Sequence, residues 1–217
     1  MRQPSDKDRN FVEYLEGLAP ADAETNGAHL ARGRAALAAL RRGVGREPGE
    51  NLEPYRYLAP WLASASWDEE RAYYLIATLF ATHRTSWPPN DSGPTERRHN
   101  LGASLSVLAA QLKDGEAESE QTPIDRRIVA LLNCSREDLP HHLRQAVALL
   151  KSKDVPVDWL QLLKDVRRWD RRDSPVQRAW ARAFWGNEGG GQHTDLPFAV
   201  EAADGDVLPI DDELNTL

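Results

Sequence analysis

The amino-acid sequence predicts an all-α protein made of two small helical bundles, joined by a short acidic linker and followed by an irregular acidic tail. Helix start and stop signals recur along the chain, and apolar residues follow a helical period between these signals. No segment shows the regular alternation of apolar and polar residues that is typical of a half-buried strand. A chain of 217 residues is long enough to form one medium or two small cores.

Individual helices are marked by their ends. Ser66 is a predicted N-cap, and residues 68–70 are acidic, which suits the first turn of a helix. Residues 71–84 are apolar almost all round and therefore predict a buried central helix. Pro175 opens a later helix and Gly186 ends it. The predicted helices cover residues 6–18, 28–43, 52–59, 67–84, 97–113, 123–133, 138–152, 157–172 and 175–185.

The polar, acidic stretch 114–122 divides the predicted helices into two groups. Residues 1–113 would form an N-terminal bundle and residues 123–186 a C-terminal bundle. Residues 187–217 begin with a glycine run, hold eight acids and no Lys or Arg, and predict an irregular tail.

Composition limits the cellular setting. The single cysteine, Cys134, excludes an internal disulfide and suits a reducing compartment. The N-terminus has no apolar stretch of signal-peptide type, and the longest apolar run, residues 72–81, is too short to span a bilayer. We therefore expect a soluble, cytoplasmic protein.

No catalytic or metal-binding motif is recognisable. The six histidines are scattered, and adjacent His141 and His142 would point in different directions on a helix. Cys134 has no local signature of an activated thiol and is interpreted as a structural residue. We therefore expect no enzymatic activity, no cofactor and no metal, and a protein that works by binding partners.

Charge is unevenly distributed along the chain. The net charge is −7, yet residues 123–186 hold thirteen bases and eight acids. Residues 187–217, by contrast, hold acids and no Lys or Arg. A basic module beside an acidic tail indicates binding to a polyanion. Arginine outnumbers lysine by 22 to 5. Arginine forks bind phosphates well, although a GC-rich genome would produce the same ratio.

Basic residues gather on two predicted helical segments. On a helix over residues 157–172, five bases line one face opposite an apolar stripe, with Asp165 and Asp170 flanking the bases. The next helix places Arg178 and Arg182 four residues apart, and Trp185 falls on their side, where we expect it to be exposed at a partner contact. The other segment, residues 25–46, contains no acid. The predicted nucleic-acid-binding residues are Arg32, Arg34, Arg41, Arg42, Lys164, Arg167, Arg168, Arg171, Arg172, Arg178 and Arg182. The four tryptophans from 159 to 185 are interpreted mainly as core residues and secondarily as base-stacking residues.

These segments resemble CasB, the small subunit of the type I-E CRISPR surveillance complex, Cascade. The resemblance spans roughly residues 10–186, in order, and leaves the tail outside. The segments that carry it are residues 30–43, 67–84, 124–132, 159–169 and 176–185.

The resemblance implies two helical bundles, no catalysis, and a pair of CasB subunits that touch the CasC backbone and the large CasA subunit. It also implies that the subunits hold the opened target DNA and the displaced strand, so that the R-loop formed with the guide RNA does not close again. The family's basic surface maps onto the arginines and the lysine named above.

Two other interpretations stay open. A stand-alone DNA-binding regulator would need a recognition helix that mixes polar readers with bases, whereas the exposed face of residues 157–172 offers only Arg and Lys. A protein–protein adaptor would use the same arginines against acidic partners.

Overall fold

We describe a computed structural model of the protein, in which residues 4–18, 27–87, 99–113 and 123–186 are placed. The regular structure of these residues is helical, apart from one parallel bridge between Ser86 and Val157, and the predicted all-α class is confirmed. The helices are α1 (Pro4–Gly17), α2 (Gly27–Arg42), α3 (Tyr55–Leu62), α4 (Trp67–Thr82), α5 (Leu101–Lys113), α6 (Pro123–Leu132), α7 (Leu139–Ser152), α8 (Trp159–Arg167) and α9 (Pro175–Trp185). None of the described helices has both the length and the apolar character needed to cross a membrane.

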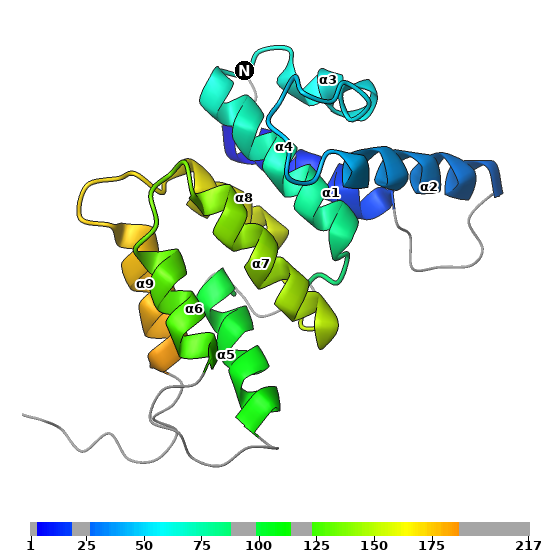
Figure 1. The fold of residues 1–217 in the computed structure, drawn as a ribbon. Coiled ribbons are helices and arrows are strands. Elements are labelled where there is room, and N and C mark those ends of the chain that lie inside the picture. The colour runs from blue at the N-terminus through cyan, green and yellow to red at the C-terminus, as the bar shows by residue number, and fades with distance from the viewer. Residues whose placement is uncertain (1–3, 19–26, 88–98, 114–122, 187–217) are drawn as a thin grey trace, which may run out of the picture.

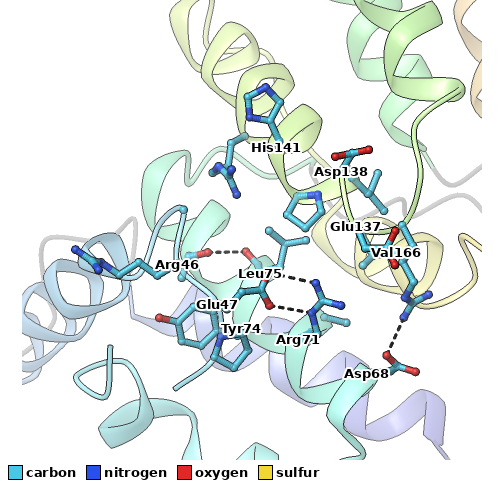
Figure 2. A pocket seen from close by; sticks show the side chains of 18 residues that line it. Arg46, Glu47, Asp68, Arg71, Tyr74, Leu75, Glu137, Asp138, His141 and Val166 are labelled. Carbon is cyan, nitrogen blue, oxygen red and sulfur yellow. Dashed lines mark hydrogen bonds and ion pairs between the residues drawn. The ribbon is translucent and has the colours of Figure 1, made fainter. Parts of the chain in front are cut away.

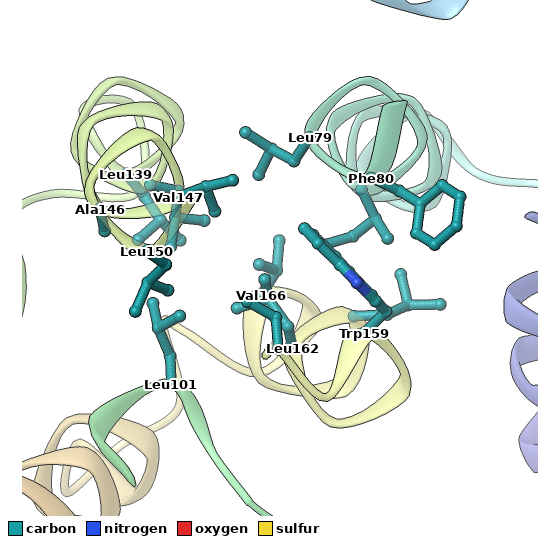
Figure 3. Packing of buried hydrophobic residues seen from close by; sticks show 14 of the residues in the cluster. Leu79, Phe80, Leu101, Leu139, Ala146, Val147, Leu150, Trp159, Leu162 and Val166 are labelled. Carbon is teal, nitrogen blue, oxygen red and sulfur yellow. The ribbon is translucent and has the colours of Figure 1, made fainter. Parts of the chain in front are cut away.

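Helix α4 is the centre of the fold, as its apolar sequence predicted. Its N-terminus is closed by a capping box, in which the Ser66 side chain accepts from the backbone N–H of Glu69 and the Glu69 carboxylate accepts from that of Ser66. Its residues from Ala72 to Ala81 are buried except for the partly exposed Leu75. Helices α2, α3, α7 and α8 pack around it. Figure 3 shows Leu79 and Phe80 of α4 facing side chains of α7 and α8 across this core.

Helix packing crosses the predicted boundary between bundles. In Figure 1, α1 to α4 lie on one side of the molecule and α5, α6 and α9 on the other. Helix α5 packs against α9, and α8 packs against α1 and α4, so helices from both sides of residues 114–122 share one hydrophobic core. The division into two bundles at these residues stays a prediction, and the linker itself lies outside the described residues, as does the tail.

The contact between α5 and α9 depends on a glycine. A Cβ atom on Gly102 would lie 2.1 Å from the carbonyl oxygen of Trp180 and 2.8 Å from its Cα. These are backbone atoms, so any side chain at this position would push the two helices apart. Asn100 supports the same contact by donating from Nδ2 to the Ala179 carbonyl over 3.2 Å.

The prediction of one helix over residues 157–172 was wrong, because α8 ends at Arg167. After it, Arg168 N–H donates to the Asp165 carbonyl over 3.0 Å, and the chain continues in turns. This reversal lets Trp169 enter the core, where its indole N–H reaches the Cys134 carbonyl at 3.3 Å. Asp173 and Ser174 then adopt positive φ values of 65° and 45° before Pro175 opens α9. Arg168, Arg171 and Arg172 lie after the end of α8, so they do not share the helical face that was predicted for them.

Asp165, expected to flank a basic surface, is instead buried between α8 and α9. Its carboxylate accepts from the Trp180 indole N–H at 2.7 Å and from Gln161 Nε2 at 2.8 Å. Burial raises the pKa of Asp165 above its usual range, although these hydrogen bonds and Arg168 oppose the shift. The cost of burying the charge is therefore only partly offset.

Asp165→Asn is expected to stabilise the protein relative to wild type more at neutral pH than near the usual carboxyl pKa of about 4. A raised pKa means that the folded state binds the proton more tightly, so the contribution of Asp165 to stability improves as pH falls. Asparagine has no charge to bury and lacks this dependence. Urea unfolding of both proteins across this pH range measures the difference, and a constant difference would contradict the prediction.

Candidate nucleic-acid interface

The predicted basic residues fall into two separate regions of the fold. Those of the first segment are on α2, which packs on α4 and lies at one edge of the molecule in Figure 1. Those of the second segment lie on α8, the turn that follows it and α9, and that turn is at the opposite edge. The two segments therefore do not form one continuous patch, and each has to be judged by the partners of its own side chains.

Of the predicted arginines on α2, some face solvent with no hydrogen-bond or ion-pair partner among the described residues, and others are paired. Arg32 and Arg34 are exposed, and neither side chain is hydrogen-bonded to the described part of the chain. Arg41 donates from Nε to the Ala81 carbonyl at 2.8 Å, where it caps the C-terminal end of α4. Arg42 forms an ion pair with Glu53. Arg41 and Arg42 are exposed as well, but both contribute to the protein's own structure.

Arg167 was predicted to line the basic face, but its guanidinium is held inside the protein. Its Nη1 atom lies 2.9 Å from both carboxylate oxygens of Asp8 on α1, and its Nη2 atom pairs with Glu69 on α4. The Tyr73 hydroxyl completes the cluster by donating to Asp8 over 2.7 Å. Only 25% of the Arg167 side chain is exposed. Arg167 therefore joins α8 to α1 and α4, and Lys164, on the same helix, is also only partly exposed.

The turn after α8 and helix α9 hold the densest group of exposed bases. Five arginines in this group are exposed: Arg168, Arg171, Arg172, Arg178 and Arg182. Two acids lie in the turn: Asp170 is engaged by Arg136 at 3.3 Å, and Asp173 is exposed, whereas helix α9 contains no acid at all. Within the described part of the chain, this surface therefore offers unpaired guanidinium groups of the kind that neutralise phosphates.

Sequence reasoning omitted two exposed arginines of the same module. Arg126 and Arg127 lie on α6, which packs against α9. The excess of bases over residues 123–186 includes them, but they are adjacent and do not form a pair four residues apart on one helical face. Their position relative to the α9 arginines depends on how α6 packs, which no local pattern indicates.

A cavity of ≈ 160 Å³ lies between the turn at residues 45–48, α4 and α7 (Figure 2). Its charged lining residues are mixed in sign, and some of them pair with one another: Arg71 forms two hydrogen bonds to Glu47, at 2.9 and 3.2 Å. Arg136 bridges Asp68 and Asp170 at the rim. A lining of mixed and mutually paired charges does not favour a nucleic-acid phosphate, so we do not assign this cavity to the interface.

Two features of the described residues bear on metal binding and on thiol chemistry. No group of three or more His, Cys, Asp or Glu side chains among them is placed to hold a metal ion. Burial raises the pKa of the Cys134 thiol to about 11, which keeps it protonated and unreactive at neutral pH.

Comparison with known proteins finds similar sequences and similar structures over most of this chain. The family model for the CRISPR-associated protein Cse2 matches residues 36–185. A CRISPR-associated protein Cse2 from Thermus thermophilus is 32% identical over 178 residues, which are 81% of this chain and 88% of that protein. Crystalline CasB from M. ruber has a TM-score of 0.62 and 29% identity, covering 84% of this chain and 94% of its own. A chain of a CRISPR RNA-guided surveillance complex has a TM-score of 0.61 and 26% identity, over 85% and 96% of the two chains.

Proposed function

The chain belongs to the CRISPR-associated Cse2 family, also called CasB, and on this premise we propose that it is a non-catalytic subunit of Cascade that grips nucleic-acid backbone. The observation that carries the proposal is the group of exposed arginines on the turn after α8 and on α9. Within Cascade, these arginines would hold the opened target DNA and stabilise the R-loop. The partners would be the CasC backbone, the large CasA subunit and a second copy of this chain.

The physical basis is neutralisation of phosphates. Guanidinium groups displace counterions from the backbone, which produces binding that depends on salt and ignores sequence. R-loop formation exchanges one duplex for another of similar stability, so a few phosphate contacts can decide whether the loop persists. We assign the interface to Arg168, Arg171, Arg172, Arg178 and Arg182, with Arg32 and Arg34 as a separate second contact.

The isolated protein is expected to bind DNA and RNA without sequence preference, with log K falling linearly as log salt rises. Reversing two charges, with Arg168 and Arg172 both changed to Glu, should make that slope shallower by about 2 and shorten the R-loop lifetime of assembled Cascade. Lys151→Glu with Lys153→Glu is the matched control, because both lysines are exposed and the change in charge is equal. Affinity is measured over a salt series, and lifetime by strand-exchange chase.

The same variants separate the proposal from its rivals. If the Arg168/Arg172 variant fails to join the other Cascade subunits, the surface is a protein interface and the chain is an adaptor. Strong preference for one duplex sequence would indicate a DNA-binding regulator. Equal effects of the arginine and lysine pairs on binding would contradict the assignment to this surface.

A further inference from the structure

Trp185 differs from the other tryptophans of the C-terminal half in being exposed. Trp159, Trp169 and Trp180 are each at most 2% exposed and belong to the core, whereas Trp185 is 37% exposed. Its ring meets the buried Phe184 edge to face, with centroids 5.2 Å apart, and this contact restrains the indole. The structure therefore presents an oriented aromatic surface to solvent at the end of α9.

Trp185 shares one face of α9 with two exposed arginines. Arg178, Arg182 and Trp185 occupy positions i, i+4 and i+7, which fall within about 60° of one another around a helix. The rise of an α-helix places the two arginines about 6 Å apart along the axis, with Trp185 about 4.5 Å further on. Trp180 and Phe184 face the core instead. We call the exposed row formed by Arg178, Arg182 and Trp185 the α9 stripe.

This combination of groups fits a single strand better than a duplex. Proteins that bind single-stranded nucleic acid combine cations that follow the backbone with aromatic rings on which bases stack. In a duplex the base faces are already covered by neighbouring base pairs, and an indole on a helix surface finds no face to stack on. A cation-only surface would bind both forms through their phosphates.

We propose that the α9 stripe binds single-stranded nucleic acid, with one unstacked base lying on the indole of Trp185 and the adjacent phosphates on Arg178 and Arg182. This inference rests on the proposed function and adds a strand preference to it. The positive charge of the stripe complements the backbone, and the absence of any acid on α9 removes a competing partner for its arginines. The occupant is a flexible strand, because only a strand with free bases can satisfy both the cations and the ring.

The test compares oligo(dT) with an abasic oligonucleotide of the same length and charge, which keeps the phosphates and removes the bases. Full-length wild type should bind oligo(dT) about 5- to 150-fold more tightly than the abasic strand, because stacking one base on an aromatic ring contributes that much. Trp185→Leu should lose this advantage and leave affinity for the abasic strand unchanged, while Trp185→Phe should restore part of it. Affinities are measured by anisotropy of the labelled strands at fixed salt.

Trp67→Leu is the matched control, since Trp67 is 56% exposed at the start of α4 and belongs to no basic row. It should bind both strands as wild type does. Equal binding of both strands by wild type, with a steep salt dependence, would overturn the stacking role and leave the proposed function standing. Failure of wild type to bind either strand would overturn both. The comparison of the two strands by wild type does not depend on the folding of any variant.

Discussion

Replacing Arg167 with alanine is expected to lower the free energy of unfolding by about 3 kcal/mol, because it strands a buried carboxylate. Asp8 is almost completely buried, and Arg167 donates to both of its oxygens. Without the guanidinium, the Asp8 carboxylate would keep the Tyr73 hydroxyl as its hydrogen-bond donor among the residues that the structure describes. Glu69 would also lose its partner on α8. Chemical denaturation monitored by circular dichroism measures the loss.

The neighbouring residue provides the control for this prediction. Arg168 is exposed and follows the end of α8, so Arg168→Ala should change stability by no more than about 0.5 kcal/mol. Its expected effect is on nucleic-acid affinity instead. Equal loss of stability in the two variants would show that the Asp8 cluster does not hold α8 in place, and would return Arg167 to the set of candidate phosphate contacts.

Trp180→Ala is expected to cost about 3–5 kcal/mol, the range observed when a large aromatic residue is removed from a core. Trp180 is completely buried, and its ring packs against Trp169 with centroids 5.2 Å apart. The substitution would leave a cavity beside the contact between α5 and α9. It would also remove the Trp180 indole N–H, which donates a hydrogen bond to the buried Asp165 carboxylate. Gln161 would then remain as a donor to that carboxylate.

A second variant separates the two causes. Trp180→Phe keeps an aromatic ring in the core but removes the indole N–H and part of the ring, so we expect it to cost less than Trp180→Ala, with about 1–3 kcal/mol coming from the unsatisfied buried acceptor. Thermal and urea unfolding of both variants give the two values. If Trp180→Phe destabilises as much as Trp180→Ala, the additional cavity of the alanine variant contributes nothing to the loss. If neither variant is destabilised, Trp180 is not a core residue.

The sequence alone determined the helices and most of their ends, because those signals are local. Ser66 and Glu69 form a capping box three residues apart, and Pro175 starts α9 without reference to any distant part of the chain. The almost entirely apolar character of residues 71–84 likewise identified α4 as the buried centre, and an apolar stripe identified Trp159 and Trp169 as core residues. The same local strings carried the resemblance to the CasB family, which the comparisons confirmed.

Only the tertiary structure decided which charged side chains are available to a partner. Arg167 and Arg168 are adjacent and chemically identical, yet one is paired with a carboxylate 159 positions away and the other faces solvent. Asp165 looks like a surface acid in the sequence and is buried against Trp180. The end of α8 depends on Trp169 turning into the core, which the continuing helical pattern does not indicate. Each of these outcomes depends on how distant helices pack, and a periodic pattern holds no information about which helix will lie opposite a given face.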